Sequence, residues 1–369
     1  MSGLKTPICE RLGIEVPIFG FSHSVAVTAA LTNAGGFGVY GAAREAPDEV
    51  SERLAEIREL VGDKPFGVDL MLPKGMPSKS LEELQAELPP EHLEFVDGLK
   101  RKYDVPPAKN QGFFNSLVRS PEFFDGQLDA VLESSTNMLA FGVGFTAEAV
   151  KRANAKGMVT AALIGLPKHA RAALDAGVEI IVAQGTEAGG HTGEISTLTL
   201  VPQAVEMAAQ EADGRVVLAA GGIGHGSQIA ASLAMGAEGV WLGTKWLTTL
   251  EHQLEAGKVE KLLASGSADT VVTRASSGKP QRQIRSSWSD EWGQPGAPQP
   301  LKMPYQHALV GDVIIAVEEN DITPLLTEPA GQSVAWCRDV SSVAEVVAEL
   351  VEETQASLAR LKAMTGQIP

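Results

Sequence analysis

The chain has 369 residues, of which 44% are hydrophobic and 21% charged, and 38 are glycine. This composition excludes extended disorder and is typical of a globular α/β protein with many tight turns. The formal net charge of -16 and the pI near 4.9 argue against binding to nucleic acid or to an anionic membrane surface, because both need clustered Lys and Arg. We therefore expect a small-molecule substrate.

The sequence predicts neither export nor a metal site. Cys9 and Cys337 are far apart and match no metal-binding spacing, so we expect neither a disulfide framework nor zinc. Residues 1–10 lack a basic stretch followed by an apolar core, and the chain has no run of about eighteen apolar residues. We therefore expect a protein of the reducing cytoplasm that does not insert into a membrane.

Short apolar, β-branched runs alternate with stretches of helical periodicity, as in successive βα units. The strands are predicted at residues 16–19, 36–40, 66–70, 138–143, 158–164, 179–183, 216–220 and 239–242. The clearest helices are predicted at residues 25–34, 48–61, 147–155, 168–176, 201–212 and 227–235. Eight such units predict an α/β fold of the (β/α)8 TIM-barrel type.

Two segments lie outside this pattern. Residues 72–126 form a long insertion after strand three, with breaks at Leu88-Pro89-Pro90 and Val105-Pro106-Pro107. Long connections in compact domains are usually functional, so we expect a lid above the C-terminal ends of the strands. Residues 266–369 form a C-terminal extension, with a polar loop region at 274–303 and a final helix at 340–364. We expect no second core, so that residues 1–369 form one domain.

Two glycine-rich turns indicate a phosphate site. In TIM barrels the loops after strands seven and eight commonly bind phosphate. Here strand seven runs into Gly221-Gly222-Ile223-Gly224 and strand eight into Gly243-Thr244, whose main-chain amides would approach an anion. A helix that begins near Ser227 would add its dipole. A single glycine cluster is as often just a tight turn, and the prediction depends on finding two clusters at the expected pair of strand ends.

The most specific segment is the glycine-rich loop at residues 184–193, which follows strand six and carries Gln184 and His191. An imidazole titrates near neutral pH, so it can remove a proton from carbon or return one. The alternative is a histidine that hydrogen-bonds the backbone of its own turn. The position at the top of the barrel favours the catalytic role. Glu187 is interpreted as a solvated or structural carboxylate.

The remaining candidates carry weaker signals. His23, after strand one, is either a second catalytic group or a brace for the next helix, whose ordinary N-cap is Ser24. Asp69, at the end of strand three, either accepts hydrogen bonds from a heterocycle or is structural. His225 is interpreted as a plain loop residue beside the phosphate turn. No role is assigned to Lys168, His169 or His252.

These motifs resemble the nitronate monooxygenase family, formerly called 2-nitropropane dioxygenases, which is similar to FMN-dependent enoyl reductases. The resemblance covers nearly the whole chain and is most specific at residues 184–191. It also includes Thr6-Pro7, Leu12-Gly13-Ile14 and the segments 33–38, 64–68, 219–223, 239–244, 278–282 and 330–332.

The resemblance implies an FMN cofactor and assigns residues to it. The implied FMN-binding residues are Asp69, Gln184, Gly189, Gly222, Trp241, Leu242, Gly243 and Thr244. His191 is the implied catalytic residue, and His23 is a second catalytic candidate. The chain departs from the family pattern at Asp69, where Asn is usual, and at Phe21-Ser22-His23, where an apolar loop is usual. The long insertion indicates a differently shaped, larger substrate cavity.

The resemblance implies oxidation of alkyl nitronates with O2 to carbonyl compounds and nitrite, with His191 orienting the anion or deprotonating a neutral nitroalkane. The alternative is an FMN-dependent reductase or dehydrogenase that acts on an enone, quinone or acyl thioester and is linked to NAD(P)H. A third interpretation is a flavin-free barrel that binds a phosphorylated metabolite, because a fold does not fix a function. The substrate, the redox partner and the oligomeric state stay open.

Overall fold

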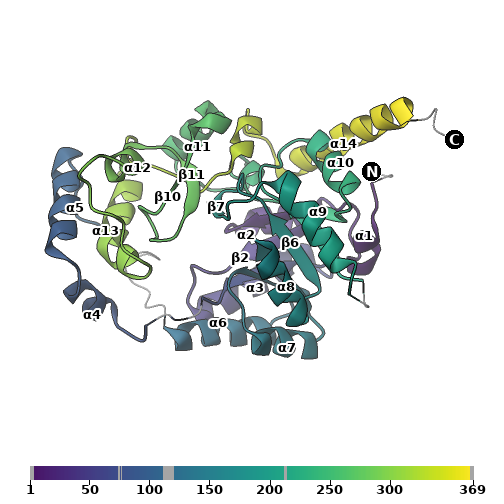
Figure 1. Cartoon of the computed structure of the whole chain (residues 1–369), viewed down its shortest axis with the longest axis horizontal. Helices are drawn as coiled ribbons and strands as arrows, with labels where there is room; N and C mark the ends of the chain where they lie inside the picture. Colours follow the sequence, from purple (N-terminus) through teal and green to yellow (C-terminus); the bar gives the residue numbers. More distant parts are fainter. Residues whose placement is uncertain (1–3, 74, 76, 111–119, 212–213, 366–369) are drawn as a thin grey trace.

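The computed structural model describes residues 4–73, 75, 77–110, 120–211 and 214–365. Eight parallel strands close into a barrel, in which each strand pairs with the next and the last pairs with the first (Figure 1). They are β1 (Ile18–Ser22), β2 (Phe37–Gly41), β3 (Gly67–Met71), β4 (Met138–Val143), β5 (Val159–Ile164), β6 (Ile180–Gln184), β8 (Val216–Ala220) and β9 (Gly239–Leu242). Each overlaps its predicted range, and the predicted TIM barrel is confirmed.

Helices surround the barrel on its outer side. They are α2 (Val25–Asn33), α3 (Pro47–Val61), α6 (Pro121–Glu133), α7 (Ala147–Ala155), α8 (Pro167–Asp175), α9 (Thr197–Ala208), α10 (Gly226–Ala234) and α14 (Val343–Thr365). The helix predicted to begin at residue 201 begins instead at Thr197. The reason is tertiary, since the Glu187 carboxylate accepts a 2.9 Å hydrogen bond from the Thr197 amide and so caps the first turn.

Side chains alternate along the strands between two apolar clusters, as the two-residue repeat of a strand requires. Phe19, Phe37 and Trp241 point into the barrel, where Ile8 and Leu12 of α1 (Pro7–Leu12) belong to the same cluster. The alternate positions belong to a larger cluster that includes the surrounding helices, for example Ile18, Val68, Val240, Leu54, Ile229 and Val347. The helix-facing cluster fixes the barrel, and the barrel fixes the positions of its strand ends.

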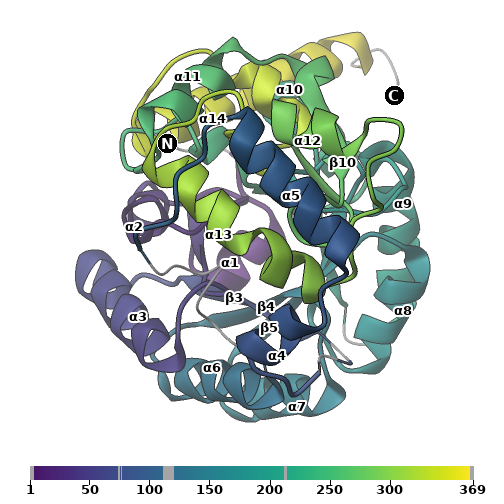
Figure 2. The same cartoon turned by 90° about the vertical axis from the view of Figure 1, so that its left-hand side faces the viewer.

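The insertion and the C-terminal extension pack together as a cap over one end of the barrel (Figure 2). Helices α4 (Leu81–Ala86) and α5 (Pro90–Lys102) contact α13 (Tyr305–Glu319), and α12 (Ser287–Trp292) joins them. Leu99, Trp292 and Val313 belong to an apolar cluster of the cap that is separate from both barrel clusters. The cap therefore has an apolar cluster of its own, and the expectation of one domain without an independent second core stays a prediction. The apolar residues of this cluster are divided between two distant segments, and neither segment alone predicts a core.

A small antiparallel sheet connects the cap to the barrel rim. It consists of β10 (Thr270–Thr273), β11 (Gln281–Ile284) and β7 (Gly190–His191), in the order β10-β11-β7. Residues 274–303, predicted to be a loop region, thus contain a strand and the helix α12. Other short elements here are α11 (Ala256–Ala264) and the 3-10 helices η1 (Thr244–Trp246), η2 (Ser267–Asp269) and η3 (Gln332–Trp336).

Among the described residues, no helix has both the length and the apolar character that a membrane-spanning segment requires.

Candidate active site

A cavity of about 840 Å³ lies where the C-terminal ends of the barrel strands face the cap. Every residue that the sequence proposed as catalytic or cofactor-binding lines this cavity. These residues are His23, Asp69, Gln184, Gly189, His191, Gly222, Trp241, Leu242, Gly243 and Thr244. They come from five barrel strands or the loops after them, and they meet because parallel barrel strands all end at the same rim. Their individual roles stay predictions.

The two proposed phosphate turns lie side by side, because β8 and β9 are neighbouring strands. Gly221 and Gly222 have φ angles of 100° and 68°, which favour glycine. A Cβ at Gly222 would lie 2.8 Å from the Glu187 Cβ, so a larger residue there would distort the turn itself. A Cβ at Gly243 would have no neighbour closer than Phe21 at 4.0 Å. The turn after β9 is therefore open to the cavity, as an anion site requires.

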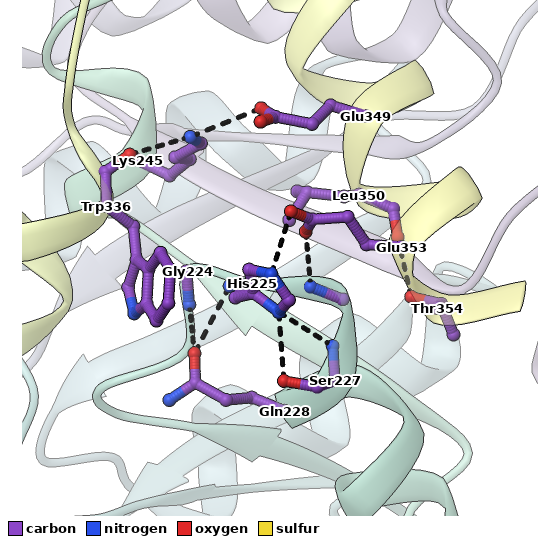
Figure 3. Close-up of polar contacts among 11 residues, drawn as sticks. Gly224, His225, Ser227, Gln228, Lys245, Trp336, Glu349, Leu350, Glu353 and Thr354 are labelled. Carbon is purple, nitrogen blue, oxygen red and sulfur yellow. Dashed lines mark hydrogen bonds and ion pairs between the residues drawn. The ribbon is translucent and has the colours of Figure 1, made fainter. Parts of the chain in front are cut away.

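The main-chain amides at the N-terminus of α10 donate hydrogen bonds to side chains of the protein itself (Figure 3). The Gly226 amide donates to the Glu353 carboxylate at 2.7 Å, and the Ser227 amide donates to Nδ1 of His225 at 3.1 Å. The amides of Gly224 and His225 both donate to Oε1 of Gln228. These four amides therefore bond within the protein, and the contribution of the helix dipole to an anion site stays a prediction.

His225 is more than a plain loop residue. Its Nε2 lies 2.9 Å from the Glu353 carboxylate of α14, and its ring packs on Trp336 with centroids 4.6 Å apart (Figure 3). His225 is not among the residues that line the cavity. It joins the turn after β8 to the C-terminal helix, which the sequence did not predict.

His191 lies at the end of the short strand β7, directly opposite Gln281 of β11. Its Nδ1 is 3.1 Å from the carbonyl oxygen of Pro280, and the Gln184 amide donates to the His191 carbonyl at 2.7 Å. A carbonyl oxygen can only accept, so Nδ1 carries the proton. The neutral ring then has its lone pair on Nε2, which is the form that a general base needs.

The loop that carries His191 is held by contacts with distant residues. The Glu187 carboxylate accepts hydrogen bonds from the amide and the hydroxyl of Thr197, so it is structural. A Cβ at Gly189 would lie 2.7 Å from the backbone of Ala330, so only glycine fits between the loop and the C-terminal segment. These contacts fix the position of His191 from both sides of the loop.

Asp69 is a buried carboxyl group at the cavity wall, with 4% exposure. Its Oδ2 has no hydrogen-bond partner among the described residues. Burial raises the pKa of Asp69 well above its ordinary value of 3.8. The site therefore favours the uncharged acid, which can donate one hydrogen bond.

Three further imidazoles line the cavity, those of His23, His252 and His307. Nδ1 of His23 donates to the Gly41 carbonyl at 2.6 Å, and burial together with Arg44 lowers the pKa of His23 well below 6.5. His252, to which the sequence assigned no role, also lines the cavity, and burial and Arg44 lower its pKa to about 4. The rings of His23 and His252 are therefore neutral at physiological pH.

Ser24 is the N-cap of α2, as predicted, and accepts from the Val27 amide.

The sequence missed the residues that face the barrel from the cap. The cavity wall on this side is formed by Trp288, Met303, Val313, Ile314 and Val317, together with Ser276, Gln281 and Gln283. No described residue between 72 and 110 or between 120 and 126 lines the cavity. The described part of the insertion instead packs behind α13. The only sequence signal for this wall was the segment 278–282, which carried the family resemblance but no assigned role.

Known proteins share this architecture. The family described as nitronate monooxygenase has a model that matches residues 8–353. The chain belongs to the nitronate monooxygenase family. It is accordingly an oxidoreductase.

Several family relatives match most of the chain. A Mycobacterium tuberculosis protein provisionally named a monooxygenase is 41% identical over 376 residues, covering 98% of this chain and 99% of its own length. A Staphylococcus aureus protein provisionally named a nitronate monooxygenase is 30% identical over 314 residues, covering 79% of this chain and 81% of its own.

Two solved structures are similar along nearly their full lengths. Nitroalkane oxidase from Streptomyces ansochromogenes aligns with a TM-score of 0.81 at 26% identity, covering 96% of this chain and 99% of that one. FabK from Thermotoga maritima aligns with a TM-score of 0.76 at 25% identity, covering 98% of this chain and 100% of that one. The nitronate monooxygenase family is thus related to the enoyl reductases, as the sequence motifs indicated.

Proposed function

We propose that this nitronate monooxygenase family member binds FMN in the barrel-top cavity and oxidises alkyl nitronates with O2 to carbonyl compounds and nitrite. The observation that carries the proposal is that one cavity contains both the glycine turns after β8 and β9 and the base-competent imidazole of His191. The similarity to nitroalkane oxidase supports the same chemistry.

The residues of the cavity fit FMN. Gly243 leaves space for a phosphate beside the turn of Gly222, where main-chain amides suit a dianion. Asp69 and Gln184 offer polar groups for a heterocycle, and the unpartnered Oδ2 of Asp69 is an atom that such a ring would satisfy. When bound, FMN supplies the redox chemistry with substrate and O2 that no side chain of this cavity provides.

His191 is the base we assign to the reaction. With its proton fixed on Nδ1 by Pro280, its Nε2 can take the proton from the α-carbon of a nitroalkane or, once protonated, hold the nitronate oxygens. His23 suits this task less well, because burial disfavours the charged ring that proton uptake creates. We therefore assign His23 a neutral hydrogen-bonding role toward the substrate.

One observation favours a second candidate, a reductase or dehydrogenase acting on an enone, quinone or acyl thioester with NAD(P)H. The wall from α12 and α13 carries the apolar side chains of Trp288, Val313, Ile314 and Val317 beside the polar His307 and Glu318, and its apolar part suits a substrate with a larger body than a short nitronate. The similarity to FabK points the same way.

The central prediction concerns His191→Ala. The variant keeps its FMN but turns over neutral 2-nitropropane, whose α-carbon must first lose a proton, about a hundred-fold more slowly or worse, the usual cost of losing a general base. Oxygen consumption by the FMN-loaded protein measures this. His169→Ala, an exposed histidine of α8, is the control that keeps full activity. Unchanged turnover in His191→Ala would remove His191 from the mechanism.

The same preparation separates the candidate functions. Oxygen consumption with propane-2-nitronate, together with flavin absorbance that NAD(P)H does not bleach without oxygen, supports the monooxygenase. Rapid anaerobic bleaching by NAD(P)H supports the reductase. A colourless protein that takes up no added FMN contradicts both and favours the flavin-free barrel.

A further inference from the structure

A row of polar side chains lies beside His191 on one face of the small sheet. Gln281 is directly opposite His191 in the register of β7 and β11, so both point to the same side. Gln283, two residues further along β11, points to that side as well. All three line the cavity. Arg282 alternates to the other face, where its Nε donates to the Thr186 carbonyl at 3.0 Å.

The orientation of the Gln283 amide follows from its neighbours. Its Oε1 accepts from Nε2 of Gln281 at 3.0 Å and from the Ser276 hydroxyl at 3.3 Å. In this arrangement the NH2 group of Gln281 donates and the side-chain oxygen of Gln283 accepts. The NH2 group of Gln283 therefore takes no part in these two hydrogen bonds.

This NH2 group is buried without a hydrogen-bond partner. Gln283 has 0% exposure, and its Nε2 contacts no acceptor among the described residues. Buried polar groups are nearly always hydrogen-bonded, so an exception at a cavity wall is a place where a bound ligand or an ordered water can supply the partner. Nε1 of Trp288, which also lines the cavity, is a second buried donor without a hydrogen-bond partner among the described residues.

We propose that Gln283 is a substrate-binding residue whose Nε2 donates a hydrogen bond to an oxygen of the substrate. The inference rests on the proposed function and deepens it. Diagonal neighbours on paired strands have Cβ atoms about 7–8 Å apart, within reach of long side chains, so Gln283 and His191 can hold two parts of one small molecule.

The substrate class follows from these positions. It carries an acceptor oxygen close to the carbon that His191 serves, and an apolar body that lies against Val313 and Ile314 of α13. A nitronate oxygen meets this description well, because it is negatively charged and a hydrogen bond to it is charge-assisted. Gln283 supplies this donor without adding a charge to the cavity.

The test compares Gln283→Met with Gln306→Met in the FMN-loaded enzyme. Gln306 is a matched buried glutamine at 0% exposure, outside the cavity, whose Oε1 and Nε2 are bonded to Leu301 and Ala275. We expect Gln283→Met to raise KM for propane-2-nitronate roughly 10- to 100-fold with little change in kcat, the signature of a lost ground-state contact to a charged group. Gln306→Met should lower the melting temperature and leave KM unchanged.

Two results would overturn the inference. One is an unchanged KM in FMN-loaded Gln283→Met. The other is a weakened FMN affinity with an unchanged KM, which would assign Gln283 to the cofactor. If Gln283→Met does not fold, Gln283→Glu is the second variant, because it keeps the oxygen that accepts from Gln281 and Ser276. It must show the same rise in KM at alkaline pH, where the carboxylate cannot donate a hydrogen bond.

Failure of the proposed function gives a different result. If FMN-loaded wild type consumes no nitronate, the monooxygenase proposal fails, and binding then decides the role of Gln283. Anaerobic difference spectra of the flavin with added propane-2-nitronate give the dissociation constant. A weaker constant in Gln283→Met supports the inference, whereas equal constants, or no binding by wild type, overturn it.

Discussion

Asp69 determines the charge of the proposed cofactor site. The sequence resemblance implies Asn as the usual residue at this position, and a protonated carboxyl group has nearly the shape of an amide and, like it, combines a donor group with an acceptor oxygen. Burial without a cationic partner favours this protonated form in the chain. Asp69 can therefore contact a heterocycle much as Asn does, provided that it keeps its proton.

Asp69→Asn tests this state through stability. The folded-state pKa is raised above the unfolded value, so the folded protein binds more protons, and its stability falls as pH rises above about 3.8. The variant lacks this penalty. We expect the flavin-free variant to melt at a higher temperature than wild type at neutral pH, with the difference shrinking toward about pH 4. A constant difference at all pH values would show that Asp69 ionises normally.

The histidines show how far single residues can be interpreted from the sequence. His191 and His23 were both assigned to the rim because they follow strand ends, and both line the cavity. Their tautomers are set by the carbonyls of Pro280 and Gly41, which lie far from them in the chain. His252 was assigned no role because it starts or flanks a predicted helix, yet the fold places it at the same cavity.

At the scale of elements, the C-terminal helix supports the phosphate turn. Helix α14 packs on α10, and Glu353 reaches both the Gly226 amide and His225 (Figure 3). Gln228, which belongs to α10, donates to the Gly222 carbonyl at 2.7 Å. The turn after β8 is thus connected to α14 through α10, although more than a hundred residues separate them in the chain.

We expect Glu353→Ala to lower the free energy of unfolding by about 1–3 kcal/mol, because it leaves the Gly226 amide and His225 without their acceptor. The control is Glu352→Ala, an exposed neighbour on α14, whose effect should stay within about 0.5 kcal/mol. Urea unfolding measures both. Equal effects of the two substitutions would show that this contact does not hold α14.

At the scale of the molecule, a buried ion cluster fastens the cap. Nζ of Lys258 in α11 lies 2.7 Å from Glu318 of α13 and 3.2 Å from both Glu255 and Glu328. Burial alone would lower the pKa of Lys258, but the carboxylates of Glu328, Glu318 and Glu255 outweigh it and raise the pKa above 10.5. The cluster contributes stability that is present at neutral pH and lost as pH rises through the raised value.

Lys258→Met leaves three carboxylates facing one another. We expect it to destabilise the protein by about 3–5 kcal/mol at neutral pH, the usual cost of breaking a buried ion pair. Part of the loss should be recovered near pH 5, because protonation of these carboxylates at lower pH removes part of their mutual repulsion. Thermal melts at the two pH values check this. Lys151→Met, at an exposed position of α7, is the control and should change neither melt.

The sequence by itself determined the barrel and the rim. Apolar alternation along strands such as 216–220 and glycine turns such as Gly243-Thr244 are local properties of the chain, and closure of eight parallel strands brings all their C-terminal ends to one place. The residues that line the cavity, from His23 to Thr244, could therefore be predicted from their positions after the strands. The match to the family model spans residues 8–353, which include these segments.

Only the tertiary structure decided what faces that rim. The apolar wall of α13, the unpartnered amide of Gln283 and the lone carboxyl of Asp69 are defined by which distant segments meet, and the periodicity of a segment does not encode its partners. Burial without a partner is likewise a property of the folded neighbourhood, because the same Gln or Asp in a solvated loop would bond to water. The chain therefore fixes where the chemistry lies, and the packing of the cap fixes the hydrogen bonds and charges that a substrate meets there.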